Sequence, residues 1–202
     1  MAAFRLDFIS GAIENKMKED EARSIYDHLE KFAQYGFNKS HSTAYAIVAY
    51  QTAWLKTFYP AEFIAANLTT EMENLDRVVI LIEEAKNMGV AVHPPDVNTS
   101  FSDFRSSTNG EILFGLSAVK NVGHKVTECI AETRERMGNY ASISDLCKNI
   151  EPHVMNRKAL ESLIGAGACD SLVGTRAQNF ASVESALSFG TKFNQDQDTQ
   201  QV

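Results

Sequence analysis

FGLSAVKNVGHKV occupies residues 114–126, and KALESLIGAGACD occupies residues 158–170, of this 202-residue chain. Each stretch predicts a short helix that glycine interrupts, at Gly123 in the first and at Gly165 and Gly167 in the second. The two segments resemble diverged copies of one unit: a short helix, a hairpin that contains glycine, and a second helix. Glycine suits such a hairpin because it permits a tight turn and a close approach to the backbone.

Helical periodicity also precedes this repeat. Apolar residues recur at helical spacing over residues 20–34, then from an expected N-cap at Ser42 to Pro60, and again from Pro60 onward. Asn74 is expected to cap a further helix. We therefore predict a helical segment over residues 1–88 and a mainly α fold.

The pattern changes in the middle of the chain. The run VAVHPP at residues 90–95 predicts a short extended piece, because the residue before a proline is restricted towards β geometry. The dipeptide at Asn109 and Gly110 lies between two β-prone runs and is a good hairpin signal. These features predict a small β element over residues 89–115, between the helical segment and the repeat at residues 116–188.

Composition limits the class of protein. With 44% hydrophobic residues the chain can form a core, and no run approaches the ~20 apolar residues that span a bilayer. No signal peptide is apparent, so we expect a cytoplasmic protein without membrane contact. Residues 189–202 are polar and predict a disordered tail. The three cysteines lack the close spacing of zinc ligands, so we expect them reduced, with no metal bound.

The net charge of −7 argues against a generally basic nucleic-acid binder. The charge is unevenly spread, however. Residues 61–115 hold three basic and nine acidic side chains, whereas residues 1–60 hold seven of each and residues 116–188 eight of each. Any contact with nucleic acid is therefore expected in the flanks.

The run YGFNKSHSTAY at residues 35–45 places a cation, hydroxyls, an imidazole and aromatic rings on a turn that enters a helix. The start of a helix offers unpaired N–H groups and the positive end of the dipole, which suit a phosphate. Lys39 would neutralise a triphosphate, and His41 would pack on a base or donate to phosphate. From composition alone, a capped helix with a solvated lysine is the better explanation of the run.

Several runs together carry a resemblance to a known family. They are YGFNKSHS at 35–42, AY at 44–45, YQT at 50–52, WLK at 54–56, YPAEF at 59–63, HPPDVN at 93–98, FGL at 114–116, AVKNVG at 118–123, NRKALE at 156–161 and GACD at 167–170. In one register over residues 8–188, the chain resembles the alpha subunit of family C bacterial replicative DNA polymerases. The resemblance implies the C-terminal part of the fingers, followed by a tandem helix-hairpin-helix region.

The resemblance also implies partners. The first part would contact the incoming deoxynucleoside triphosphate, and the repeat would bind duplex DNA through phosphates without reading its sequence. The expected nucleotide-binding residues are Lys39, Ser40, His41 and Tyr45. The expected DNA-binding residues are Lys120, Asn121, Gly123, Lys125, Gly165, Gly167 and Arg176.

No catalytic residue is expected in this chain. Polymerisation uses two Mg²⁺ ions held by paired carboxylates, and the only D-x-D here, at residues 196–198, lies in the polar tail. In the family those carboxylates belong to a palm N-terminal to this segment. We therefore expect the chain alone to be inactive and to bind no cofactor. Mg²⁺, the sliding clamp and other replisome subunits are expected for the full-length protein only.

Two other interpretations stay open. One is a free-standing helix-hairpin-helix module that binds DNA by itself. The other is a helical scaffold whose glycine hairpins touch no phosphate. Salt-dependent duplex affinity distinguishes the first from the second.

Overall fold

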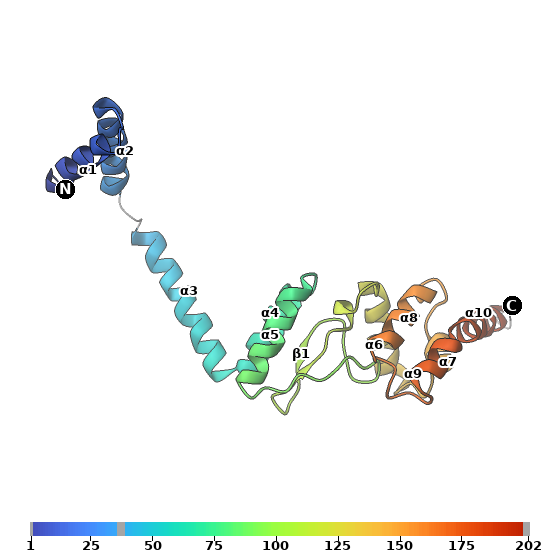
Figure 1. The fold of residues 1–202 in the computed structure, drawn as a ribbon. Coiled ribbons are helices and arrows are strands. Elements are labelled where there is room, and N and C mark those ends of the chain that lie inside the picture. Colours follow the sequence, from blue (N-terminus) through green and yellow to red (C-terminus); the bar gives the residue numbers. More distant parts are fainter. Residues whose placement is uncertain (1, 36–38, 200–202) are drawn as a thin grey trace. The chain divides into compact units, whose positions relative to one another are not determined.

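A computed structural model of the chain describes residues 2–35 and 39–199, and Figure 1 labels its elements. The chain forms two compact units, Met1–Ala53 and Trp54–Val202. The fold is mainly α with one two-stranded antiparallel sheet, which confirms the predicted fold class.

The first unit contains a helical hairpin. Its elements are α1 (Ala2–Glu14), α2 (Glu19–Tyr35) and the first part of α3 (Lys39–Phe58). Ile9 on α1 is buried, as are Ala22 and Tyr26 on α2. Arg5 pairs across the two helices with Glu30, at 3.1 Å between Nη1 and Oε2. Burial of apolar side chains supplies most of the stabilisation of such a pair, because an exposed ion pair contributes little.

The start of α3 differs from the expectation. Ser42 does not cap this helix, because α3 already begins at Lys39. The Thr43 hydroxyl donates to the Lys39 carbonyl at 2.8 Å, a bond that belongs to a formed helical turn. Residues 36–38, which belong to the turn predicted before this helix, lie outside the described residues.

Two helices and the small sheet form the first part of the second unit. They are α4 (Pro60–Thr70), α5 (Leu75–Asn87), β1 (Arg105–Ser106) and β2 (Ile112–Leu113). Pro60 opens α4, where its missing N–H costs nothing. Asn74 caps α5 by accepting from the Arg77 N–H at 3.3 Å, as predicted. The predicted hairpin is also confirmed, and Gly110 has φ +74° in its turn.

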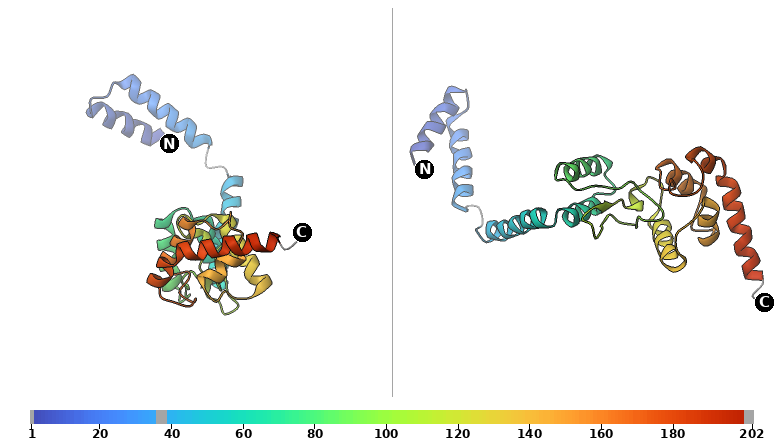
Figure 2. Two further views of the ribbon diagram at one scale, coloured as in Figure 1. Left: turned by 90° about the vertical axis from the view of Figure 1, so that its right-hand side faces the viewer. Right: turned by 90° about the horizontal axis from the view of Figure 1, so that it is seen from below.

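A hydrophobic cluster joins these elements: α4 packs against both strands and against α5 (Figure 2, right). It includes Ile64, Leu68 and Ile112, which are fully buried. Phe114 packs against this cluster, with its ring centre 4.7 Å from that of Phe104, and it packs against the second cluster as well.

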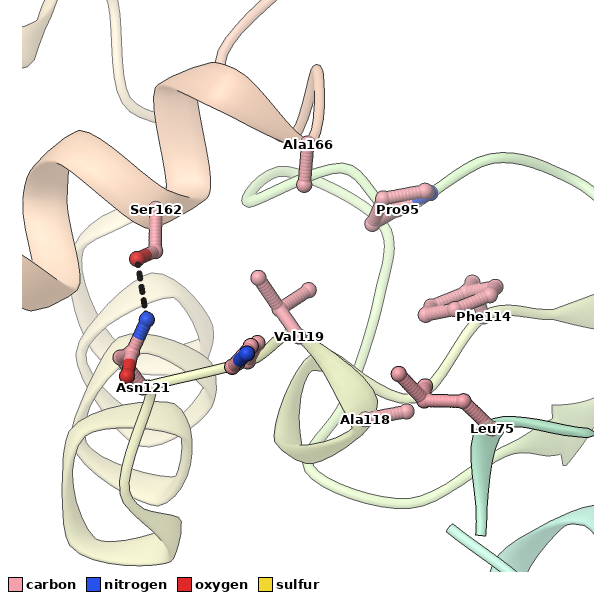
Figure 3. Close-up of a pocket in the computed structure, with 9 residues that line it drawn as sticks. Leu75, Pro95, Phe114, Ala118, Val119, Asn121, Ser162 and Ala166 are labelled. Carbon is pink, nitrogen blue, oxygen red and sulfur yellow. Dashed lines mark hydrogen bonds between the residues drawn. The ribbon is translucent and has the colours of Figure 1, made fainter. Parts of the chain in front are cut away.

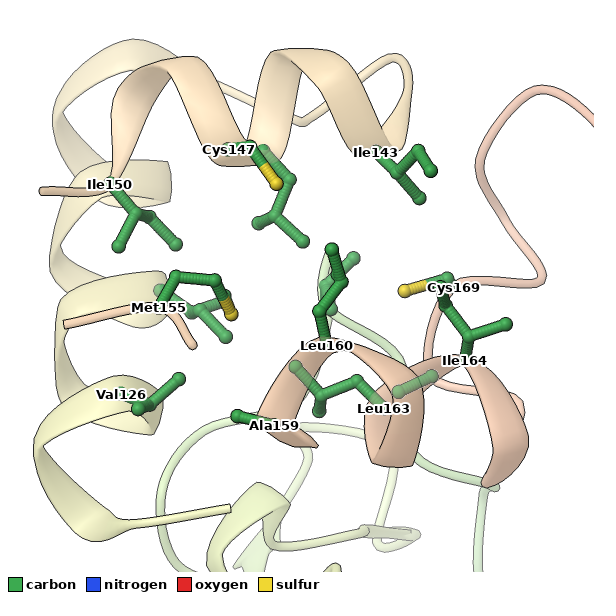
Figure 4. Packing of buried hydrophobic residues seen from close by; sticks show 14 of the residues in the cluster. Val126, Ile143, Cys147, Ile150, Met155, Ala159, Leu160, Leu163, Ile164 and Cys169 are labelled. Atoms are coloured by element: carbon green, nitrogen blue, oxygen red, sulfur yellow. The ribbon is translucent and has the colours of Figure 1, made fainter. Parts of the chain in front are cut away.

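The second cluster fills the rest of the unit. The surrounding elements are η1 (Leu116–Ala118), α6 (His124–Met137), α7 (Ile143–Asn149), α8 (Arg157–Gly165), α9 (Arg176–Ala181) and α10 (Val183–Thr199). Figure 4 shows Leu160 and Leu163 of α8 pointing into this core beside Ile143 and Cys147 of α7. The two glycine-containing segments therefore share one interior.

The loop before the sheet is held by polar contacts to this helical core. The Arg134 guanidinium donates to the carbonyls of Val97 and Ser100, at 2.9 and 2.6 Å. Asn98 exchanges two hydrogen bonds with the Tyr140 backbone, at 3.0 and 2.8 Å. The HPPDVN run thus has a structural role that its sequence did not reveal.

The predicted disordered tail over residues 189–202 is wrong as far as Thr199, because α10 continues to that residue. Its polar sequence is held by contacts with α7. Asn194 donates to the Lys148 carbonyl at 3.2 Å, and the Lys148 ammonium lies 4.5 Å from the Phe193 ring centre. The last three residues lie outside the described part of the chain.

Gly190 gives a test of this docking, because a Cβ at that position would collide with the Cys147 carbonyl. Ala normally stabilises a helix relative to Gly by about 0.5–1 kcal/mol. Here we expect Gly190→Ala to lower the free energy of unfolding by about 1–2 kcal/mol through overpacking. In the matched control Gly165→Ala, where a Cβ meets nothing within 4 Å, we expect a gain. Urea denaturation measures both, and a gain at both positions would contradict the docking of α10.

Candidate nucleic-acid interface

The first hairpin runs from Val119 to Gly123 and joins η1 to α6. The Val122 N–H donates to the Val119 carbonyl at 3.1 Å, which closes the turn. Asn121 takes the left-handed conformation that the turn needs, with φ +67°. Gly123 instead has φ −75°, so the expectation that this glycine supplies the tight turn is wrong. Asparagine is one of the few residues that tolerate the left-handed region, because its short amide bonds locally.

Unpaired backbone amides follow this turn. The N–H groups of Gly123, His124 and Lys125 meet no acceptor among the described residues. The next two, of Val126 and Thr127, donate to the Gly123 carbonyl at 2.9 and 3.3 Å. No side chain caps α6. Consecutive free amides at a helix start form a site suited to an anion such as phosphate.

Lys120 and Lys125 flank these amides. Both side chains are exposed, and neither makes an ion pair within the described residues. A Cβ at Gly123 would meet nothing within 4 Å, so the backbone there is open to an approaching ligand. The predicted residues Lys120, Asn121, Gly123 and Lys125 therefore come together in one hairpin.

The hairpin is fixed to the second repeat. Figure 3 shows the Asn121 side chain reaching α8, where its Nδ2 lies 3.4 Å from the Ser162 Oγ. Val119, on the same turn, lines an open hollow of about 380 Å³ with Pro95 and Phe114. Asn121 thus both forms the turn and connects it to α8.

The second hairpin, between α8 and α9, has a different geometry. Gly165 is the last residue of α8, and Gly167 supplies the left-handed residue with φ +85°. Arg176 is bound by Asp170, with Nε 2.7 Å from one carboxylate oxygen and Nη2 2.5 Å from the other. The hydrogen bonds from Arg176 lower the pKa of Asp170 from its usual value. A Cβ at Gly167 would collide with the Arg176 guanidinium, so this glycine makes room for the ion pair.

The start of α9 is closed by its own side chains. The Thr175 hydroxyl accepts from the Gln178 N–H at 3.3 Å, and the Gln178 side chain accepts from the Thr175 N–H at 2.9 Å. This reciprocal capping box satisfies the N-cap amide of α9, whose counterpart at α6, the Gly123 N–H, meets no acceptor among the described residues. Among the described residues, α6 therefore begins with three unpaired amides and α9 with two, those of Arg176 and Ala177. The two hairpins also differ in their cations, since Arg176 is paired with Asp170 while Lys120 and Lys125 make no described ion pair.

The predicted nucleotide-binding residues lie on the first two turns of α3. The rings of His41 and Tyr45 are one turn apart, with centres at 4.4 Å. Lys39, Ser40, His41 and Tyr45 are all exposed. At about 100° per residue, Lys39 lies about 200° around the helix from His41, so the four side chains do not form one cluster.

The cysteines show no sign of a metal site. Cys147 and Cys169 are buried, and burial raises the pKa of each thiol to about 12. Across the described residues, no group of three or more His, Cys, Asp or Glu side chains is placed to hold a metal ion. In the same residues, no helix is both long and apolar enough to cross a bilayer.

Sequence reasoning missed His124, the first residue of α6. Its Nδ1 lies 3.2 Å from the Ser117 Oγ, and its Nε2 lies 3.2 Å from a carboxylate oxygen of Glu128. The sequence did hold one indication of this residue, because His124 directly follows Gly123, where the second helix of the unit was expected to begin. The imidazole is thus held beside the free amides.

Two glycine-containing hairpins, each between helical turns and packed on one core, have the arrangement of a helix-hairpin-helix motif. In agreement, the model of the helix-hairpin-helix motif family matches residues 89–179. The chain is also similar to one segment of the alpha subunits of bacterial DNA polymerase III. It is 46% identical to that subunit of Vibrio cholerae over 96% of its length, 48% identical to that of Thermus aquaticus over 93%, and 45% identical to that of Escherichia coli K12 over 93%. It spans only 15–17% of the length of these relatives.

The left-handed turn residue gives a direct test of the first hairpin. Asn121→Gly should keep the fold, because glycine adopts positive φ freely. Asn121→Val should lower the free energy of unfolding by about 1–3 kcal/mol, since a β-branched residue is strained there. Ser162→Ala is the control for the side-chain hydrogen bond alone, and should cost about 1 kcal/mol or less. Equal stability of the Gly and Val variants in urea denaturation would contradict a left-handed residue 121.

Proposed function

We propose that this segment serves DNA replication by holding duplex DNA through its phosphates, without reading base sequence, as part of a DNA polymerase III alpha subunit. One observation carries the proposal: three consecutive unpaired amides, at Gly123, His124 and Lys125, between the unpaired lysines Lys120 and Lys125. Amides and ammonium groups bind phosphate oxygens and carry no base specificity. The net charge of −7 limits the affinity of the chain by itself.

Within this proposal the two hairpins have different roles. The first hairpin contacts phosphate directly. In the second, Arg176 is neutralised by Asp170, and the capping box satisfies the N-cap amide of Thr175. Gly165 and Gly167 then act by shaping the α8–α9 connection, which supports the core behind the first hairpin.

We further propose that the start of α3 contacts the incoming deoxynucleoside triphosphate in the full-length subunit. The paired rings of His41 and Tyr45 offer an aromatic surface for a base, while Lys39 and Ser40 supply a cation and a hydroxyl for phosphate. Because Lys39 and His41 lie on nearly opposite sides of the helix, the two side chains would contact different parts of one nucleotide.

The chemistry of nucleotide transfer is assigned to other parts of the full-length subunit. Two Mg²⁺ ions held by paired carboxylates would bridge the attacking and leaving oxygens there. In this chain, the D-x-D at residues 196–198 begins with Asp196, an exposed residue near the end of α10. We expect no polymerisation by this chain alone, and we assign contacts with the sliding clamp and other replisome subunits to the full-length protein.

Salt dependence tests the binding of DNA. Removing one lysine that binds phosphate should reduce the slope of log affinity against log salt by about one unit. We expect this change in Lys120→Ala and Lys125→Ala, and no change in the matched control Arg176→Ala, whose guanidinium is already paired. Fluorescence anisotropy with two duplexes of unrelated sequence measures the slopes, and circular dichroism checks the fold.

Identical slopes for wild type and both lysine variants would instead favour a helical scaffold that touches no phosphate. A strong preference for one duplex sequence would contradict recognition through the backbone alone.

The proposed nucleotide binding is tested in a full-length alpha subunit that carries this segment. Lys39→Ala and His41→Ala should each weaken nucleotide use by roughly ten- to a hundredfold in kcat/KM, as expected when a charge-assisted hydrogen bond of about 1.5–3 kcal/mol is removed. Duplex affinity should stay unchanged. Lys18→Ala, an exposed lysine outside α3, is the control. Unchanged kinetics together with reduced DNA affinity would indicate that the start of α3 contacts the duplex and not the incoming nucleotide.

A further inference from the structure

His124 is fixed by a chain of hydroxyl groups that leads into the core. The Ser117 Oγ lies 3.2 Å from the His124 Nδ1 and 2.9 Å from the Thr127 Oγ1. Thr127 is fully buried and lies 2.9 Å from the Ser102 Oγ. A side chain anchored in this way loses little further freedom when a ligand arrives. The imidazole therefore has a defined place at the open end of α6.

The charges that face His124 are mostly negative. Glu128, one turn along α6, lies 3.2 Å from its Nε2. The same side of α6 and the loop before β1 line a hollow of about 220 Å³ beside the imidazole. The other charged residues of that hollow are Asp103, Arg105, Glu132 and Glu135. Of the hairpin lysines, Lys120 lies on the turn before His124 and Lys125 follows it directly in the sequence.

We propose that His124 is a further DNA-binding residue of the first hairpin, with its protonation setting the strength of phosphate binding and Glu128 opposing it. The inference rests on the proposed function, since it assigns a role in the same site. The backbone N–H of His124 is one of the three unpaired amides, so the imidazole belongs to the same residue as one of the groups proposed to bind phosphate. No comparable charge change exists at the second hairpin, whose described cation is an arginine bound by Asp170.

The direction of the effect follows from the charges. When the imidazole is neutral, the pair with Glu128 carries one negative charge beside the phosphate. When the imidazole is protonated, the pair is neutral, and the repulsion is removed. Histidine is the side chain that changes charge between pH 5 and 8. Duplex affinity is therefore highest at low pH and falls as the pH rises through this range.

The experiment is a duplex titration of the 202-residue chain between pH 5.5 and 8 at low salt. The amide resonances of Gly123, His124 and Lys125 follow binding by NMR, which detects weak complexes. For wild type we expect affinity to fall by about two- to fivefold across the range, as for one unit charge at 4–8 Å in water. His124→Gln should flatten this change. Glu128→Gln should raise affinity by about two- to fivefold at pH 8 and keep the pH dependence.

His153→Gln is the matched control, because His153 is exposed and lies 3.1 Å from Glu151 away from both hairpins. It should keep the wild-type profile. If His124→Gln keeps the wild-type profile while Lys120→Ala still weakens binding, the role of His124 is overturned and the DNA-binding hairpin stands. If the three amides do not respond to duplex at any pH, both proposals fall.

Discussion

A buried positive charge holds the loop at residues 97–100 in place, and much of the larger unit depends on that interaction. Removal from water lowers the pKa of Arg134, and a buried charge without partners would cost several kcal/mol. The carbonyls of Val97 and Ser100 supply those partners, and they in turn need a donor because the loop has no strand or helix to satisfy them. The Val97 N–H then donates to Ala168 at 2.8 Å, which positions the second hairpin. One guanidinium thus connects α6, the loop and the α8–α9 connection.

Local signals accounted for most of the fold. The Asn74 cap and the Asn109-Gly110 hairpin were predictable because the residues that form them are neighbours in sequence. The extent of α10 was not predictable in the same way. Its last turns are polar, and their order depends on Asn194 and Phe193 meeting Lys148, a residue more than forty positions earlier. The prediction of disorder used only the composition of the segment itself, and that composition does not depend on contacts with residues elsewhere in the chain.

In the candidate site, too, features set by neighbouring residues were predictable and features that depend on side-chain pairing were not. The pattern around Gly123 predicted the position of a turn and of a helix start, which the structure confirms, while phosphate binding by Lys120 and Lys125 stays a prediction. It did not show that Asn121 takes the left-handed position, because asparagine and glycine both tolerate it. Nor did it distinguish the two copies. Their difference lies in side-chain pairing, of Arg176 with Asp170 and of Thr175 with Gln178, which the shared glycines do not reveal.

Phe114 belongs to both hydrophobic clusters of the larger unit, and this has a consequence for cooperativity. If either cluster became disordered, one side of an aromatic ring would be exposed to water, and the other cluster would give up part of its own packing. The layer of α4 and α5 and the helices behind the first hairpin are therefore thermodynamically coupled, and Phe114 is one of the side chains that couple them. The turn at Asn121 directly follows Val119, a buried residue of the second cluster, so loss of packing around α4 and α5 would also weaken the support of this turn.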